Sequence, residues 1–323
     1  MELRTGRSAA VILGCLTLGA SAVAGPVMSA RLAADGQVDI TEDGKPVLRY
    51  NYRTIEPGER LKEIAAPNLI YARPRSDYIH PLYGFEGEEL TRDLPVDHPH
   101  HRGIYWAWPE TKYGEEMGDL HALQRVFARP TGKLKTRSGR TYAEIQAENL
   151  WQWEDREPIV RETATIRAYR TGPSGRFIDL TFRFEGLKAG VSIARRGTNL
   201  YGGLNMRMNE NRGQSIRFHT DEPDHQPRAA WAEMHGAFAA ATHPTSVIVM
   251  QHPKNPAYPG DWVQYPELNW YQPTFPAPDT RWPLPPGTAL TLRYRLWIRS
   301  GAPVEEGAAA ARWKEFAAGK TPK

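Results

Sequence analysis

The chain has 323 residues and a formal net charge of +4, the small difference between 41 basic and 37 acidic side chains. Because this excess is mild and spread along the chain, the composition excludes a strongly basic nucleic-acid-binding protein, and beyond the N-terminus no apolar stretch reaches the length of a membrane span. The single cysteine, Cys15, excludes a disulfide scaffold and, once a leader is removed, cysteine nucleophiles and thiolate metal sites.

Residues 1–24 have the features of a secretory signal peptide. Arg4 and Arg7 give a positive start, a short apolar run follows, and Ala22-Val23-Ala24 matches an A-x-A cleavage site. The sequence therefore predicts a periplasmic or secreted protein whose mature part, residues 25–323, forms one domain. Lipoprotein processing at Cys15 is the alternative, although the apolar run continues beyond that residue.

Alternation of apolar and polar residues predicts β-strands along most of the mature chain. Residues 38–41 and 47–50 flank an Asp-Gly turn, which is a hairpin signal. Residues 163–169 and 177–185 are joined by a turn rich in glycine and proline, and residues 290–298 repeat the alternation. These runs indicate strands that bury one face.

Only the C-terminus has a clear helical pattern. Pro303, Glu305 and Glu306 suit a first helical turn, and Gly319 suits the end of a helix. Many short strands, few helices and no structural cysteines predict an all-β fold, a large two-sheet sandwich with a short C-terminal helix.

The segment D-H-P-H-H-R, residues 97–102, concentrates groups that titrate, ligate metals or bind anions. In an extended segment His98 and His100 would share one face and His101 would lie on the other, while the proline favours an edge, a bulge or a loop. His100 or His101 could act as general acid or base, with Asp97 fixing its tautomer. Alternatively, His98 and His100 could ligate a divalent metal ion, with Asp97 as a third ligand or orienting partner; no other cofactor is expected.

A carbohydrate or small sugar derivative is the expected partner. Aromatic rings flank polar residues in several places, which is typical of sugar-binding clefts because flat rings stack on pyranose faces; packing in a core is the alternative role for any single ring. Glu162 is the expected carboxylate partner of the histidines. The candidate substrate-binding residues are Arg75, Tyr78, His80, Arg102, Trp106, Asn205, Arg207, His252, Asn255 and Trp262.

The string D-H-P-H-H-R-G, residues 97–103, resembles the signature of a bacterial domain family of unknown function whose members often carry the label methane oxygenase PmoA. Residues 78–82, 201–204 and 252–256 fall in that family's order, so the resemblance covers roughly residues 35–300. The label conflicts with the lack of apolar spans, so methane oxidation is not expected. In size and strand richness the family resembles the large supersandwiches of galactose-mutarotase-like enzymes, which implies, by analogy alone, a sugar-acting fold.

The sequence thus predicts a secreted carbohydrate-active enzyme of lyase, hydrolase or epimerase type that uses histidine acid–base chemistry. A glycosidase normally needs two facing carboxylates, and no such pair stands out, which favours lyase or epimerase chemistry slightly. A non-catalytic sugar-binding module and a histidine-ligated metalloprotein are the alternatives, and the residues do not choose among them.

Overall fold

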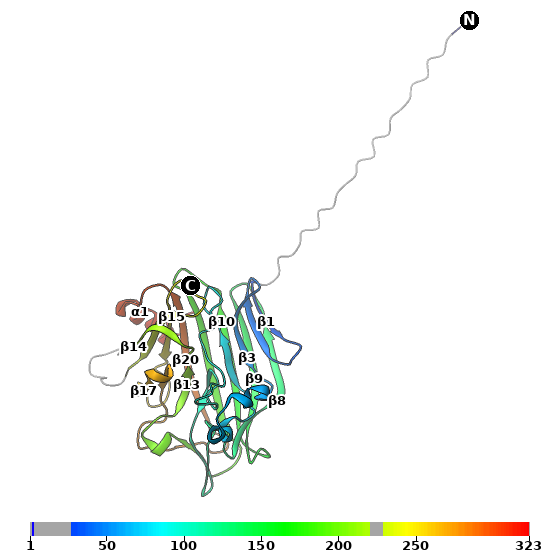
Figure 1. Ribbon diagram of the computed structural model, residues 1–323, viewed down its shortest axis with the longest axis vertical. Helices are drawn as coiled ribbons and strands as arrows, with labels where there is room; N and C mark the ends of the chain where they lie inside the picture. The colour runs from blue at the N-terminus through cyan, green and yellow to red at the C-terminus, as the bar shows by residue number, and fades with distance from the viewer. Residues whose placement is uncertain (1, 3–26, 220–228, 323) are drawn as a thin grey trace.

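The computed structural model describes residues 2, 27–219 and 229–322, so the expected signal peptide and Cys15 lie outside the described residues. Strands form three sheets (Figure 1). The first sheet has eight strands in the order β1 (Met28–Leu32), β2 (Val38–Glu42), β3 (Lys45–Asn51), β4 (Tyr78–Leu82), β5 (Ile104–Ala107), β13 (Gly203–Arg207), β18 (Trp270–Pro273) and β17 (Trp262–Tyr265).

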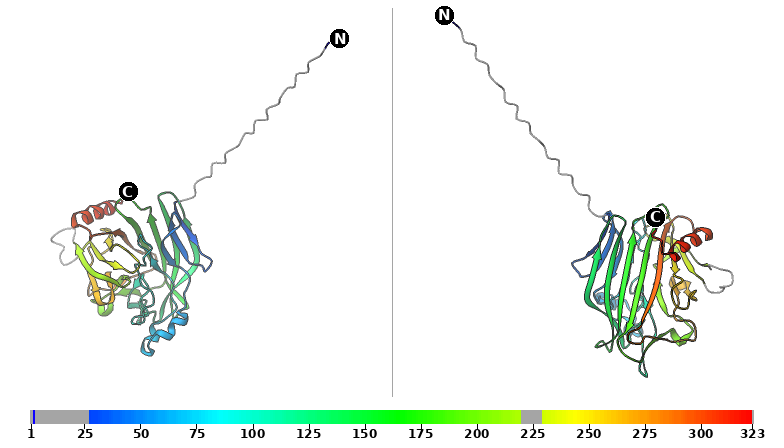
Figure 2. Two further views of the ribbon diagram at one scale, coloured as in Figure 1. Left: turned by 45° about the horizontal axis from the view of Figure 1, so that its top comes forward. Right: turned by 180° about the vertical axis from the view of Figure 1, so that it is seen from behind.

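The second sheet also has eight strands, and several of them are long (Figure 2, right). Their order is β14 (Asn211–His219), β15 (Trp231–Phe238), β16 (Thr245–Gln251), β20 (Ala289–Ser300), β11 (Arg176–Gly186), β10 (Glu157–Tyr169), β9 (Tyr142–Trp153) and β8 (Val126–Arg137). A smaller sheet, which the sequence did not predict, contains β19 (Trp282–Pro283), β12 (Val191–Ala194), β6 (Glu110–Tyr113) and β7 (Glu116–Gly118).

The alternating sequence pattern explains how the two large sheets form a sandwich. Both predicted hairpins are present, since β2 pairs antiparallel with β3 and β10 pairs antiparallel with β11. The inward side chains of the two sheets share one apolar core, in which Trp106 stacks on Trp108 at 4.5 Å and meets Phe184 edge-on. The predicted all-β sandwich is therefore confirmed.

The helices lie at the periphery of the sandwich. The α-helix α1 (Glu306–Ala317) begins after Glu305 rather than at Pro303, and Phe316 on it packs against Arg295. Two short 3-10 helices, η1 (Gly58–Glu63) and η2 (Ala66–Tyr71), lie at the opposite end of the sandwich (Figure 1; Figure 2, left). Among the described residues, no helix combines the length and the apolar character needed to cross a membrane.

Candidate functional site: a buried histidine cluster beside an open cavity

The cluster lies on the outer face of the first sheet, on the side away from the second sheet. On β5, Ile104 and Trp106 point into the core, so the strand alternation turns Tyr105 to the outer face. On the neighbouring β13 the same alternation places Asn205 opposite Tyr105, with Arg207 two residues further on. This outer layer supports the loops that carry the histidines.

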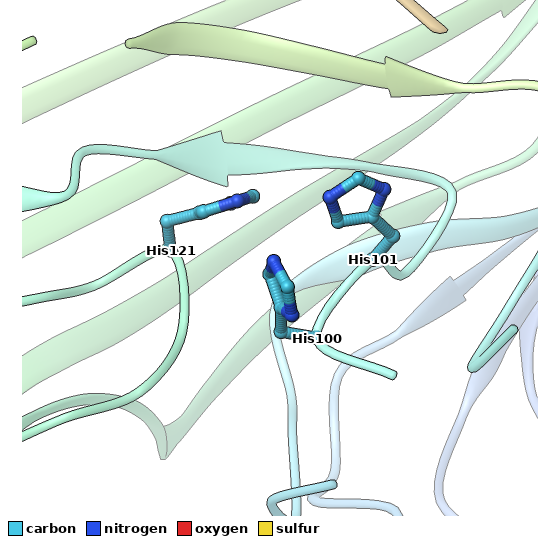
Figure 3. A group of neighbouring side chains, drawn as sticks. All are labelled: His100, His101 and His121. Carbon is cyan, nitrogen blue, oxygen red and sulfur yellow. The ribbon is translucent and has the colours of Figure 1, made fainter. Parts of the chain in front are cut away.

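Three imidazoles from two separate loops converge on this face. His100 and His101 precede β5, whereas His121 comes from the loop between β7 and β8. The three rings are directed toward one another (Figure 3), with centroid separations of 4.6 Å for His100–His101, 4.5 Å for His100–His121 and 5.3 Å for His101–His121. One nitrogen from each ring can be chosen so that all three lie within 4.8 Å of one another. These are the residues that could hold a metal ion.

The loop conformation differs from the extended segment considered above. The chain turns at Pro99, where the backbone N–H of His101 donates to the carbonyl oxygen of His98 at 2.9 Å. The turn brings the His98 ring within 5.0 Å of the His101 ring and 5.9 Å of the His100 ring, measured between centroids. His101 therefore joins the other two histidines instead of pointing away from them.

Neighbouring side chains fix the orientation of two of the rings. The Tyr105 hydroxyl lies 3.0 Å from Nδ1 of His121, and the two rings stack with an interplanar angle of 1°. On the other side of the cluster, Nη1 of Arg207 lies 3.4 Å from Nδ1 of His101. In both rings Nδ1 is thus engaged outside the cluster. Nδ1 of His100 is buried and has no hydrogen-bond partner among the described residues.

Arg75 connects the two loops that carry the histidines through hydrogen bonds to the backbone of both. Its guanidinium donates to the carbonyl oxygens of His121 and Leu120 at 2.8 Å each and to that of His100 at 3.1 Å, and it lies 4.2 Å from the centroid of the Tyr105 ring. Arg75 is 4% exposed, so its donors are committed to the backbone. The structure gives Arg75 the role of positioning the loops rather than contacting substrate.

Replacing Arg75 by methionine is expected to lower the free energy of unfolding by about 3 kcal/mol or more, because three buried carbonyl oxygens lose their donor and each such group costs roughly 1–3 kcal/mol. Urea unfolding measures the change, with Arg137→Met on the exposed part of β8 as the control. A loss no larger than that of the control would contradict the positioning role.

Burial keeps the clustered imidazoles uncharged. Burial, reinforced by the nearby charges of His98 and Arg75, lowers the pKa of His100 to about 3. Burial also lowers the pKa of His101 and of His121 well below the ordinary value, and the neighbouring histidines and arginines add to the effect. All three rings are therefore neutral near pH 7, the form in which imidazole binds metals.

An open cavity of about 500 Å³ borders the cluster. His98, His100 and His121 form one part of its wall. The other polar or aromatic side chains of the wall offer donors, acceptors and two tyrosine rings: Asn68, Tyr71, Asp97, Asp119, Gln124, Arg196 and Tyr201. Burial raises the pKa of Asp119 to about 6, although backbone N–H groups of Ala122 and His121 stabilise its charged form. A substrate in this cavity would meet carboxylates, imidazoles and aromatic faces together.

Asp97, in the cavity wall, links His98 of the same wall to the buried Arg207. Its Oδ2 lies 3.0 Å from Nδ1 of His98 and 3.2 Å from Nη2 of Arg207. Burial opposes ionisation of Asp97, but the hydrogen bond with His98 and the charge of Arg207 outweigh it and lower the pKa. The other nitrogen of His98 is thereby left for the cavity.

Four more of the predicted residues lie on the same side of the first sheet but are engaged within the protein. The Tyr78 hydroxyl accepts a hydrogen bond from Arg102 at 2.7 Å, and the buried Arg102 also forms an ion pair with the partly buried Asp93. Nδ1 of His80 lies 3.1 Å from the Thr91 hydroxyl. Asn205, on β13, is buried and donates its side-chain amide to the carbonyl oxygen of Gly103 at 3.4 Å.

Two predicted site residues lie in the core instead. Trp106 packs between the sheets, because the strand that turns Tyr105 outward must turn its neighbour inward. Glu162 is fully buried on β10, where Oε2 accepts a hydrogen bond from the indole N–H of Trp151 at 2.7 Å. The interpretation of Glu162 as the carboxylate partner of the histidines is not supported, since the first sheet separates them.

Three further predicted residues lie away from the cluster. The ring of His252 packs edge-on against Phe316 of α1, with 4.9 Å between the ring centroids. Helix α1 lies at one end of the sandwich and η2 at the other (Figure 2, left). The histidine cluster is at the η2 end, because the Tyr71 ring of η2 lies 5.2 Å from the ring of His100. Asn255 exchanges hydrogen bonds of 2.8 Å with the backbone of Arg293. The indole N–H of Trp262 donates to the carbonyl oxygen of Ala229. The expected convergence of these residues on the histidines does not occur.

The sequence reasoning missed His121, Asp119 and Arg196. His121 stands alone in its segment, with no neighbouring histidine, and only the fold brings it to the other loop. Two glycines follow Tyr201 of the cavity wall. A Cβ atom at Gly202 or Gly203 would meet backbone atoms at 2.8 Å or less, so these glycines allow close packing. The predicted metal-binding pair was His98 and His100. The structure instead groups His100 with His101 and His121 and leaves His98 out of the candidate metal site.

A model of the "Family of unknown function (DUF6807)" matches residues 37–314. The chain belongs to this family. The description of DUF6807 names neither an activity nor a methane oxygenase. No curated protein matches this DUF6807 member. One solved structure, titled as a polysaccharide lyase, matches with a TM-score of 0.26 and 10% identity over 87% of this chain and 34% of that chain, so this chain spans about a third of that protein's length.

Proposed function

We propose that this chain is a metal-dependent enzyme that binds one divalent ion through His100, His101 and His121 and acts on a carbohydrate-type substrate in the adjoining cavity. The observation that carries the proposal is the approach of one nitrogen from each of three buried imidazoles to within 4.8 Å of the others. Three imidazoles that leave one side open form the ligand set of many catalytic zinc sites. His100 and His121 also line the cavity, which gives a substrate access to that open side.

The environment of the three rings supports this assignment. Burying several imidazoles beside one another without mutual hydrogen bonds is unfavourable, and a metal ion would satisfy the nitrogens that face inward. The Tyr105 hydroxyl can accept the Nδ1–H of His121, which is the orientation that leaves the other nitrogen free to ligate. A bound divalent ion supplies Lewis acidity and activates water, while the chain's residues hold and orient the substrate.

The substrate class rests on the cavity wall. Tyr71 and Tyr201 offer flat apolar rings, and Asn68, Asp97 and Gln124 offer donors and acceptors for hydroxyl groups. Lyase, hydrolase and epimerase chemistry all fit this arrangement. A sugar-binding module would share the cavity but would bind sugars without turnover. The predicted leader supports export to the periplasm or beyond, where such substrates occur.

One contact favours a second candidate, metal-free acid–base catalysis. A guanidinium has only donors, so Nδ1 of neutral His101 accepts from Arg207 and the proton sits on the other nitrogen. That ring is then a proton donor toward the cluster, and a metal ion would have to displace the proton. At 3.4 Å the contact is long, and Asp97 also holds Arg207, so we favour the metal site.

Metal analysis of the mature chain purified without chelator tests the proposal. We expect about one equivalent of a divalent ion per chain, removable with a chelator and restored by dialysis against zinc or manganese, with turnover of oligosaccharides following the metal content. Less than about a tenth of an equivalent, together with chelator-resistant turnover, would favour acid–base catalysis instead. Binding of sugars without turnover in either state would point to a binding module.

A further inference from the structure

Resting on the proposed function, we propose that Arg196 binds an anionic group, a carboxylate or a sulfate ester, on a polyhydroxylated substrate seated in the cavity. The inference concerns the substrate class of the same site. It depends on the placement of one exposed guanidinium at the cavity wall and on the way the chain holds it there.

Arg196 differs from the other arginines near the histidine cluster. Arg75 is committed to three carbonyl oxygens, and Arg207 is paired with Asp97. The adjacent Arg195 is buried and paired with Asp261. Arg196 is exposed and lines the cavity, where its side chain interacts with the Tyr201 hydroxyl. Within residues 27–219 and 229–322 its guanidinium forms no ion pair with a carboxylate. It is therefore the cation in this region that is available to a ligand.

The backbone around Arg196 is held in a defined conformation. The N–H of Arg196 donates to the carbonyl oxygen of Tyr201 at 2.8 Å, and the N–H of Leu200 donates back to the carbonyl oxygen of Arg196 at 3.0 Å. Gly197 and Thr198 have φ of 56° and 66°, which is costly for a β-branched residue such as threonine. The N–H of Gly197 is fixed by Oε1 of Glu110 at 2.7 Å. A strained but well-anchored turn of this kind fixes where the side chain starts.

The position of the guanidinium is suited to an acidic sugar. It lies 5.9 Å from the centroid of the Tyr201 ring, and that ring lines the same cavity as Tyr71. A pyranose stacked on a tyrosine would place its ring substituents near the arginine. The planar fork of donors binds carboxylates and sulfates in a bidentate manner, which neutral hydroxyl groups cannot match.

The test compares three probes on the metal-loaded protein by calorimetric titration: a galacturonate tetramer, a sulfated galactan tetramer and a neutral galactan tetramer. We expect at least one acidic probe to bind about tenfold more tightly than the neutral one, since a charge-assisted bond exceeds a neutral one. Arg196→Gln should abolish the preference and Arg196→Lys should keep part of it. Arg212→Gln, which removes an exposed arginine from β14, is the matched control and should leave binding unchanged.

Equal binding of acidic and neutral probes, a preference that survives Arg196→Gln, or no binding of any probe at millimolar concentration would overturn the inference. Whichever acidic probe is preferred identifies the anionic group. Metal content measured on the same samples separates this inference from the proposed function, because the three candidate ligands are His100, His101 and His121 and Arg196 is not one of them. If protein that holds no metal still prefers the acidic probe, the role of Arg196 is supported and the proposed metal site is contradicted. If the protein holds metal but shows no preference, the metal site is supported and the role of Arg196 is contradicted.

Discussion

Replacing His121 by asparagine is expected to weaken metal binding by more than about 100-fold, because changes to residues that merely orient metal ligands already cost 10- to 100-fold. An asparagine amide can take the place of Nδ1 and keep the contact with the Tyr105 hydroxyl, while the second imidazole nitrogen is lost. The substitution therefore removes a ligand with little change in packing. Turnover should fall with the metal content.

Thermal unfolding provides a readout that does not depend on a known substrate. Metal at 100 times its Kd should stabilise the wild-type protein by about 2.7 kcal/mol, and the His121→Asn protein should show no such gain at the same concentration. His235→Asn on β15, where Nδ1 lies 3.0 Å from the Ser246 hydroxyl, is the matched control outside the cluster. Equal stabilisation of the wild-type and His121→Asn proteins would remove His121 from the metal site.

The fold could be predicted because the strand pattern is local. Alternation over β11 and β20, and the Asp-Gly turn between β2 and β3, each depend on residues that are neighbours in the chain. The third sheet was missed because its strands are only two to four residues long and lie between loops, so they leave no alternation to recognise.

The candidate site could be predicted only where the chain itself brings residues together. His98, His100 and His101 are adjacent in sequence, so their clustering was visible, whereas His121 reaches them through the pairing of distant strands. The prediction that His252 lies beside the histidine cluster was wrong. The sequence shows that His252 follows a buried strand, but it does not show at which end of the sandwich that strand ends, and in the structure His252 contacts α1. Trp106 shows that an aromatic residue beside a site loop can still face the core.

A second large effect is expected from Glu162, for a reason unrelated to the histidines. Its carboxyl group lies fully buried between the sheets, near the carboxyl group of Asp77. The Tyr50 hydroxyl donates to Oδ1 of Asp77 at 2.6 Å, and Asn149 donates to the Tyr50 oxygen at 2.9 Å. Burial, followed by the charge of Asp77, raises the pKa of Glu162 well above its ordinary value, and burial also raises the pKa of Asp77. The folded protein therefore keeps at least one proton on this pair near neutral pH.

The sign of the pH dependence follows from that proton. The unfolded chain releases it near the ordinary glutamate pKa of 4.5, while the folded chain retains it to higher pH. The unfolded state thus binds fewer protons above that pH, so the free energy of unfolding should fall as pH rises, by up to about 1.4 kcal/mol per pH unit for one proton, until the folded-state pKa is reached. Below pH 4.5 both states hold the proton and this contribution is fully present.

Glu162→Gln should remove most of this dependence. The amide has the shape of the neutral carboxyl group, can accept from the Trp151 indole and donate to Asp77, and carries no titrating proton. Urea unfolding from pH 5 to pH 8 should therefore give a shallower loss of stability in Glu162→Gln than in the wild-type protein, while Glu56→Gln, an exposed control, should follow the wild-type protein. Parallel curves for all three proteins would contradict the raised pKa of Glu162 in the folded state.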